Sequence, residues 1–379
     1  MRIAALGDAH LGRTATTATT VDGVNQREVD FETSFLAAVS NALELSPDLF
    51  LWLGDVFDHP RPNYRSFRVA MRALRMIRDH GIGLVAISGN HDTPRLPGVG
   101  NPYAVLADSF PEFAFSYRMA YETVDLSGLR VHCVPQTRTA EDTVDALREA
   151  DSNRSLDRVN LLLTHPLVHS VERRYADMNE IEIDDVELKS DLVLLGHYHT
   201  FQRLPQRDNV WYAGSTDTFS FSDDPDEPKG FVMVDTETGD CEHVTLAGQR
   251  QLKTPPRIDA WGRGAGEIQA EIVQRFGALP AGSVARLDLD GIDAEVYRLL
   301  DLSAIREASA HLLHHRLQPS FRATTNEGPE LIELASIGSR WRTYVGAQQV
   351  EQFDAERLVH TGQQYLDAAI DLATDSTTE

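Results

Sequence analysis

The sequence is short of cysteine, of long apolar runs and of positive charge, and each shortage excludes a class of protein. Its two cysteines, Cys133 and Cys241, lie far apart without a CxxC spacing, so neither a disulfide framework nor a thiolate metal site is predicted. No apolar run approaches the roughly 18 residues of a membrane span, and the N-terminus lacks a basic region followed by a long apolar one. We therefore expect a cytoplasmic protein that does not enter a membrane.

Positive charge is outnumbered, because 35 Lys and Arg stand against 58 Asp and Glu, for a formal net charge of −23. Binding to a nucleic-acid backbone needs clustered positive charge, so this acidity opposes a broad nucleic-acid-coating surface, although it does not exclude a local site. A chain of 379 residues is too long for one ordinary core. Two domains, or one large domain with an appendage, are expected.

The pattern of apolar runs predicts an α/β fold up to about residue 250. Strands are predicted at 3–6, 49–53, 84–87, 131–134, 160–163, 192–195 and 210–213, with a strand pair at 231–234 and 243–246. Helices are predicted at 31–45, 63–80 and 140–150, the first of them capped by Asp30. After the break at Thr254-Pro255-Pro256, a helix near 266–276, a strand at 284–289, a helix after Ser303 and strands near 317–323 and 330–334 predict a smaller α+β domain at 255–336.

Five predicted strands end in residue types that bind metal ions. The five segments are Gly7-Asp8-Ala9-His10, Gly54-Asp55-Val56-Phe57-Asp58, Gly89-Asn90-His91-Asp92, Thr164-His165-Pro166 and Gly196-His197-Tyr198-His199. Sites in α/β sheets form at the carboxyl ends of strands, and a glycine before a ligand lets the backbone turn tightly. Each motif alone is more often structural, since a lone histidine usually makes an ordinary hydrogen bond. Five such strand ends in one chain favour a shared site.

The set of side chains also indicates the chemistry. Asp, His and Asn without Cys suit manganese, iron or zinc better than a soft metal or calcium. Two ions about 3.5–4 Å apart share an anionic ligand and can clamp both the attacking and the leaving oxygen of a phosphate. In this interpretation Asn90 is a neutral ligand, His91 donates a proton to the substrate, and Asp92 orients His91.

Together the segments GDAH, GDVFD, GNHD, TH and GHYH resemble the calcineurin-like metallophosphoesterase superfamily over residues 1 to about 235. The resemblance implies a two-sheet β-sandwich flanked by helices, within a nuclease domain at 1–250. It also implies His91 as the catalytic imidazole and Asp55 as the bridge between two metal ions. One ion would be held by Asp8, His10, Asp55 and His199, and the other by Asp55, Asn90, His165 and His197.

The following segment, WYAGSTDTFSFSDDPDEPKGFVMVD, is similar to the SbcD and Mre-eleven nuclease family. This resemblance implies a manganese-dependent DNA exonuclease and endonuclease that acts in break repair and forms a homodimer. It implies a DNA-binding capping domain at 255–336 and a C-terminal segment at 340–379 that docks on an SbcC-type SMC-like coiled-coil ATPase. Many archaeal and eukaryotic relatives have a histidine three residues after the bridging aspartate. This chain has Asp58 there and His59 next, which leaves open the side chain that assists His91.

Two other functions compete with the nuclease. The same dimetal site could serve a phosphodiesterase or phosphatase acting on a small nucleotide or other phosphoester, against which the capping region and Lys229-Gly230-Phe231 argue. A non-catalytic scaffold with a decayed site is disfavoured because every expected ligand is present.

Three features outside these motifs allow two interpretations each. An arginine stripe, at Arg61, Arg65, Arg68, Arg72, Arg75 and Arg78, is either the solvated face of an amphipathic helix or a DNA-backbone contact. A histidine group, His311, His314 and His315, has metal-ligand spacing for a helix, but an exposed helix end is favoured. A helix capped by Asp354, with an apolar side at Leu358, Gly362, Tyr365, Leu366, Ala369 and Ala373, packs either on the chain's own core or on a partner.

Overall fold

The computed structural model describes residues 1–18, 20, 22–95, 98–171, 181–223 and 227–321, and also 341, 345 and 359–362. The chain divides into two units, Met1–Phe321 and Arg322–Glu379. In the second unit residues 359–362 are helical, whereas the rest of the predicted C-terminal helix and the predicted strand near 330–334 lie outside the described residues. Within the described residues, none of the helices has the length and apolar character needed to cross a bilayer.

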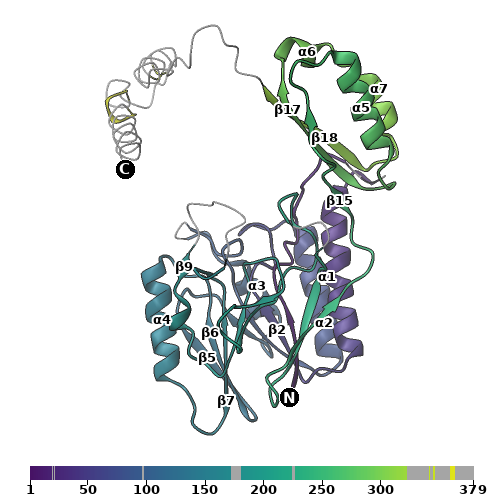
Figure 1. Ribbon diagram of the computed structural model, residues 1–379. Coiled ribbons are helices and arrows are strands. Elements are labelled where there is room, and N and C mark those ends of the chain that lie inside the picture. Colours follow the sequence, from purple (N-terminus) through teal and green to yellow (C-terminus); the bar gives the residue numbers. More distant parts are fainter. Residues whose placement is uncertain are drawn as a thin grey trace. The chain divides into compact units, whose positions relative to one another are not determined.

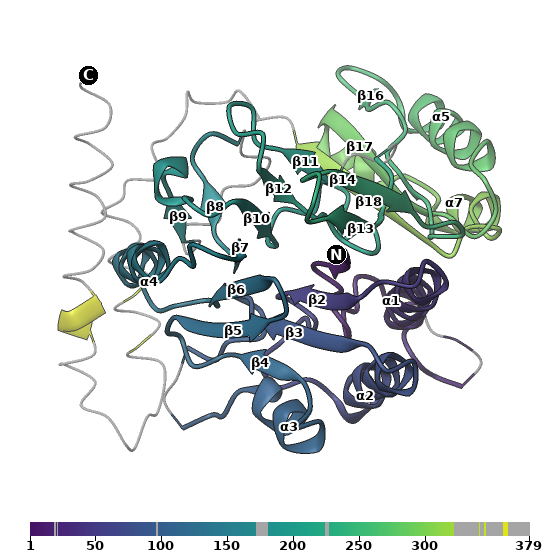
Figure 2. The same cartoon turned by 90° about the horizontal axis from the view of Figure 1, so that it is seen from below.

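Two six-stranded sheets pack face to face in the first unit (Figures 1 and 2). The first sheet has, in spatial order, β14 Cys241–Thr245, β13 Gly230–Asp235, β1 Arg2–Leu6, β2 Leu49–Leu53, β3 Gly83–Ile87 and β4 Ala114–Ser116. The second has β11 Gln202–Arg203, β12 Val210–Tyr212, β10 Leu192–Leu195, β7 Val159–Thr164, β6 Leu129–Val134 and β5 Glu122–Leu126. Strands β1 to β4 run parallel, as do β12, β10, β7 and β6, so their carboxyl ends lie at one edge.

Alternate side chains of these strands fill two different layers. Leu51 and Leu53 face residues such as Leu163 and Cys133 of the second sheet, whereas Trp52 faces the helices on the outside. Because the strands are buried on both faces, they read as continuous apolar runs, which is why the predictions for 49–53 and 192–195 agree with the observed bounds. Cys133 is fully buried in the inter-sheet core, as a strand-core residue should be, and both cysteines are free.

Helices cover the outer face of each sheet (Figures 1 and 2). On the first sheet lie α1 Gln26–Glu44, α2 Tyr64–Asp79 and α3 Pro102–Ser109, and on the second lies α4 Ala140–Ser152. The prediction that Asp30 caps the first helix is wrong. Asn25 is the N-cap and accepts hydrogen bonds from the amides of Arg27 and Glu28, so the helix begins one turn earlier. The small elements β8 Leu167–Val168, β9 Glu182–Ile183 and the 3-10 helix Asp185–Glu187 complete this layer.

Residues 252–321 form a third sheet with its own apolar core. Its strands are β15 Leu252–Lys253, β16 Ile258–Asp259, β17 Val284–Ile292 and β18 His314–Phe321, and its helices are α5 Ala265–Gly277, α6 Ala294–Arg298 and α7 Leu302–Ala308. Residues from α5, α7 and the strands share one buried cluster.

The histidine group near residue 314 belongs to this third sheet, and the favoured interpretation as a helix end is wrong. His314 and His315 begin strand β18. His311 Nε2 lies 3.0 Å from the Leu279 carbonyl oxygen, and His315 Nδ1 lies 2.8 Å from Ser309 Oγ. Because each of these two side chains has its own protein partner, a shared metal site is disfavoured.

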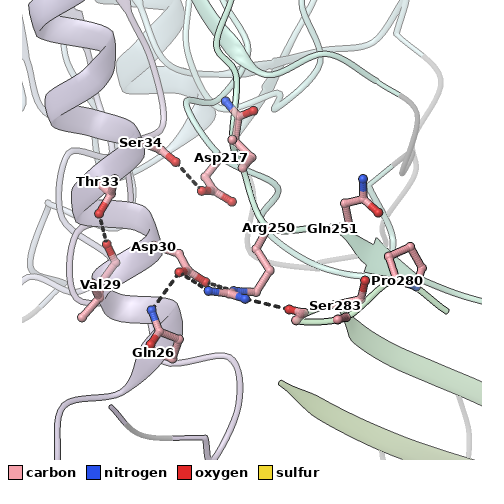
Figure 3. A pocket seen from close by; sticks show the side chains of 14 residues that line it. Gln26, Val29, Asp30, Thr33, Ser34, Asp217, Arg250, Gln251, Pro280 and Ser283 are labelled. Atoms are coloured by element: carbon pink, nitrogen blue, oxygen red, sulfur yellow. Dashed lines mark hydrogen bonds and ion pairs between the residues drawn. The ribbon is translucent and has the colours of Figure 1, made fainter. Parts of the chain in front are cut away.

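One arginine ties helix α1 to the loop before β17. Arg250 donates two hydrogen bonds to the Asp30 carboxylate, one of them 2.8 Å from Nη2 to Oδ1, and Nη1 donates to the Gly282 carbonyl. These groups border a cavity of about 350 Å³, into which Asp217 also projects (Figure 3). Asp30 therefore serves as an ion-pair partner inside the helix, which explains why it is not the cap.

Candidate metal centre

The carboxyl ends of five parallel strands bring the predicted ligands together. Asp8 follows β1, Asp55 follows β2, Asn90 follows β3, His165 follows β7, and His197 with His199 follows β10. Three overlapping groups have candidate ligand atoms within 4.8 Å of one another: Asp8, His10 and His199; Asp8, Asp55 and His165; and His10, Asp55 and His91. Asn90 and His197 complete the arrangement, since Asn90 Oδ1 lies 3.0 Å from His197 Nδ1.

Asp55 occupies the middle of this arrangement. Its Oδ2 lies 3.2 Å from His165 Nε2 and 4.0 Å from His10 Nε2, so one oxygen faces a histidine from each of the two predicted metal positions. Its Oδ1 accepts the backbone N–H of His91 at 2.8 Å, which fixes the carboxylate plane. This placement suits a bridging ligand.

The histidines present nitrogen atoms that fit a cation. His10 Nε2 and His199 Nε2 lie only 3.1 Å apart, roughly the spacing of two ligands on one ion with metal–nitrogen bonds near 2.1 Å. The buried His165 Nε2 makes no well-aligned hydrogen bond among the described residues, although Asp55 Oδ2 lies 3.2 Å from it. His165 Nδ1 lies 2.6 Å from the Leu53 carbonyl and donates to it, which orients the ring with Nε2 toward the carboxylates. The residues present therefore fit two divalent ions.

The charges of the candidate ligands also favour a cation. Burial lowers the pKa of His165, but the Asp55 and Asp8 carboxylates outweigh burial and raise it to about 9. Burial raises the pKa of Asp8 to about 7, even though the nearby His165 opposes this. At Asp55 burial is outweighed by His165 and His91, so its pKa is lowered. A proton on His165 thus offsets negative charge that divalent ions would neutralise when bound.

The backbone at the site is held in an unusual conformation. Four of the predicted ligands have positive φ, namely Asp8 at 48°, His10 at 46°, Asp55 at 49° and His197 at 81°, and only two other described non-glycine residues do. Such conformations cost of order 1–3 kcal/mol each and persist where the surrounding structure over-determines them. The concentration of strain at predicted ligands marks this edge as a functional site.

Glycines before the ligands make room for side chains. A Cβ at Gly89 would lie 2.2 Å from Asp55 Oδ1 and 2.6 Å from His165 Nε2, and one at Gly196 would lie 2.5 Å from His165 Nδ1. Gly54 has φ of +97°, so there the tight turn matters as well. At position 89 a glycine is needed because Asp55 and His165 lie so close to the backbone, and not because the backbone turns unusually there.

His91 is positioned differently from the prediction. Its Nδ1 lies 3.0 Å from the Asp58 carbonyl oxygen and 3.7 Å from Asp58 Oδ1. Asp92 instead accepts backbone N–H bonds from Val56, Phe57 and Gly89, so it joins two ligand loops and does not orient His91. The hydrogen bonds of Asp92 thus differ from the predicted role of orienting His91, and of the pair Asp58 and His59 it is Asp58 that contacts His91, mainly through its backbone carbonyl.

The electrostatics around His91 favour its cationic form. Burial lowers its pKa, but Asp55, the Asp58 carbonyl and the Asp58 carboxylate outweigh burial, so the net pKa is raised. The side chain is 33% exposed, whereas His10 and His165 are at most 1% exposed. A half-buried imidazole with a raised pKa, next to the predicted ligands, can give a proton to a substrate.

Lys229 supports the last ligand from behind. The buried Nζ donates to the carbonyl oxygen of His199 at 2.7 Å and lies within 3.6 Å of the Asp223 and Glu227 carboxylates. The Lys-Gly-Phe segment that follows the motifs thus contacts the metal centre directly.

Two residues at the site have no role in the sequence predictions. The Phe219 ring lies 4.4 Å from the His10 ring and 4.6 Å from the His199 ring, centroid to centroid. Arg13 stacks on Phe219 and pairs with Asp58. The nearness of Arg13 to His10 in the chain is a weak signal, and Phe219 gives none.

All six arginines of the stripe are exposed; Arg61 lies in the loop before α2 and the other five lie on the helix. Arg65 is held by Glu32 through two hydrogen bonds of 2.6 Å, and Arg78 pairs with Asp79. No partner among the described residues engages the guanidinium groups of Arg61, Arg68 or Arg72. A DNA contact by the stripe stays a prediction, with Arg65 the least available member.

Comparison with known proteins agrees with the site. The family described as Calcineurin-like phosphoesterase matches residues 1–201. The chain is similar to DNA double-strand break repair protein Mre11 of Methanocaldococcus jannaschii, with 27% identity over 58% of this chain and 60% of that protein. The Mre11 of Methanococcus maripaludis is 27% identical over 68% of this chain and 67% of its own length. The Mre11 of Thermoplasma acidophilum is 22% identical over 95% of this chain and 94% of its own length.

Proposed function

Because the chain belongs to the calcineurin-like phosphoesterase family, we propose that it is a two-metal DNA nuclease that hydrolyses phosphodiester bonds during break processing. The convergence of three aspartate and asparagine side chains and four histidines at one sheet edge carries the proposal. These are Asp8, His10, Asp55, Asn90, His165, His197 and His199.

The chemistry follows from how these residues are held. The two ions, which we propose to be Mn²⁺, would activate a water molecule and neutralise phosphate charge. Asp55 offers its two oxygens in different directions, and Asp8 is fixed by the His197 N–H at 2.9 and 3.1 Å. His91, held at Nδ1 by Asp58, gives its Nε2 proton to the leaving oxygen.

DNA is the proposed substrate because relatives at 22–27% identity are named DNA double-strand break repair proteins, one of them along 94% of its length. From the resemblance of the sequence to the SbcD and Mre-eleven family we propose a cytoplasmic homodimer that acts with an SbcC-type SMC-like ATPase. Residues 1–250 would be the nuclease domain, 255–336 a DNA-contacting cap and 340–379 the ATPase-docking segment. A small-phosphoester hydrolase is the alternative on the same site.

The test is a cleavage assay with purified protein and Mn²⁺. Substrates are end-labelled single-stranded and duplex DNA and bis(p-nitrophenyl) phosphate, a chromogenic phosphodiester. We expect metal-dependent cleavage of DNA that is lost in Asp55→Ala. Hydrolysis of the chromogenic ester without any DNA cleavage would support the alternative instead.

A further inference from the structure

Arg13 is fixed on three sides at the rim of the metal centre. Its guanidinium carbon lies 3.3 Å from the centroid of the Phe219 ring, its Nε donates to the Phe219 carbonyl at 3.3 Å, and its Nη1 donates to Asp58 Oδ1 at 3.2 Å. A guanidinium stacked on an aromatic ring and held at two nitrogens loses little further freedom when it binds a ligand. Such preorganisation is typical of a recognition group.

The two partners of Arg13 contact the proposed proton donor and two proposed metal ligands. Phe219 packs against His10 and His199 and lies 6.2 Å from the His91 ring. Asp58 contacts His10 Nδ1 at 3.2 Å and His91 through its carbonyl. Arg13 thus contacts two residues that themselves touch the proposed proton donor and two proposed ligands.

A purely structural role leaves part of this arrangement unexplained. Asp58 already pairs with His10 and lies against His91, so it does not need Arg13 as its only partner. Among the described residues none pairs with Arg13 Nη2, and a quarter of the side chain is exposed. A guanidinium presents its N–H groups in a planar fork that matches phosphate oxygens. In a chain of net charge −23, a fixed cation beside this centre favours an anionic substrate.

We propose that Arg13 binds a backbone phosphate of the DNA strand next to the scissile one, and that Phe219 is the positioning residue that holds the guanidinium in place. This inference rests on the proposed DNA nuclease function and names one of its substrate contacts. The basic stripe on α2 is not needed for it.

The experiment compares Arg13→Gln with wild type and with Arg148→Gln, a matched control on α4 whose side chain is 60% exposed. Steady-state kinetics in Mn²⁺ are measured on a single-stranded oligonucleotide and on bis(p-nitrophenyl) phosphate, which has one phosphate and no neighbour. Arg13→Gln should raise KM for the oligonucleotide by between about 10-fold and 100-fold, the effect of a lost charged hydrogen bond. The kinetic constants for the chromogenic ester should change by less than about twofold in Arg13→Gln, and Arg148→Gln should behave as wild type on both substrates.

Salt dependence separates phosphate binding from an indirect effect. For Arg13→Gln the slope of log affinity for single-stranded DNA against log salt should shrink by about 0.7, the value for one lost phosphate contact. An equal fall in kcat on both substrates, with KM and salt slope unchanged, would mean that Arg13 acts only through Asp58 and His91 and would overturn the proposal. Wild-type kinetics in Arg13→Gln would overturn it too.

A second variant tests the role of Phe219. Phe219→Leu should raise KM for the oligonucleotide, and adding it to Arg13→Gln should cause no further loss, because the ring acts through the guanidinium. Additive losses would overturn the positioning role. Metal content and circular dichroism check that each variant folds. If wild type cleaves the chromogenic ester but no DNA, the proposed function itself fails, a result distinct from the variant outcomes.

Discussion

Replacing Gly89 by alanine should disable the metal centre and leave the fold in place. The new Cβ would stand 2.2 Å from Asp55 Oδ1, 2.6 Å from His165 Nε2 and 2.7 Å from the Asp55 nitrogen. Gly89 is not among the residues with positive φ, so the backbone accepts alanine without strain and the whole effect comes from lost space.

The displacement can be judged against ordinary contact distances. A Cβ normally approaches other heavy atoms no closer than about 3.4 Å, so the Asp55 carboxylate would have to move by roughly 1 Å. Metal–ligand distances tolerate only about 0.2 Å, and a misplacement of about 1 Å can cost about 100-fold in rate. We therefore expect loss of at least one ion and a fall in turnover of 100-fold or more, as an order of magnitude.

The assay is a metal titration with elemental analysis, alongside hydrolysis of bis(p-nitrophenyl) phosphate. Gly266→Ala is the control, because a Cβ near the start of α5 meets nothing within 4 Å. That variant should keep both metals and normal turnover, and gain up to about 1 kcal/mol in stability. A Gly89→Ala protein with two bound ions and wild-type turnover would refute the packing argument.

Three further predictions concern the fold and the catalytic imidazole. Arg27→Met should destabilise the protein by about 3–5 kcal/mol in thermal unfolding. The substitution leaves the fully buried Asp217 carboxylate, which lies 2.9 Å from Arg27, without its cation. An unchanged melting temperature would count against this prediction. Burial raises the pKa of Asp30, but hydrogen bonds from Arg250 and Gln26 outweigh burial, so the net pKa is lowered. The Asp30 carboxylate therefore contributes to stability above about pH 4, and this contribution is lost as the pH falls through the pKa of Asp30 in the folded protein. Arg250→Gln should therefore flatten the stability profile in that acid range, and identical acid-unfolding curves would argue otherwise. His91→Leu should keep both metals and lose about 10²–10⁴-fold in cleavage, which near-normal turnover would disprove.

The strands were predictable because burial on both faces makes them continuous apolar runs. The start of α1 was not predictable from apolar periodicity, because its first turn is polar. Arg27 is buried there and donates hydrogen bonds to Asp217 and to the Thr218 carbonyl, partners 190 and 191 residues away that periodicity cannot reveal. The same limit applies to His314 and His315, whose spacing suits a helix but which pair in a strand with β17.

The candidate site shows a similar division. Residue type and glycine spacing at strand ends were enough to select side chains that the structure brings together, because parallel strands share one edge. The orientation of His91 was not predictable. Asp92 is its neighbour in sequence, yet its carboxylate turns to the amides of Val56 and Phe57, and the contact comes from Asp58. Phe219 lies in the segment that resembles the nuclease family, but nothing in that resemblance indicated that its ring would lie against His10 and His199.

Anomalous diffraction from crystals grown with Mn²⁺ tests the central claim most directly. The account predicts two manganese peaks about 3.5–4 Å apart on either side of the Asp55 carboxylate, one beside His10 and His199 and the other beside His165. A single peak, or two peaks that do not share Asp55, would contradict it.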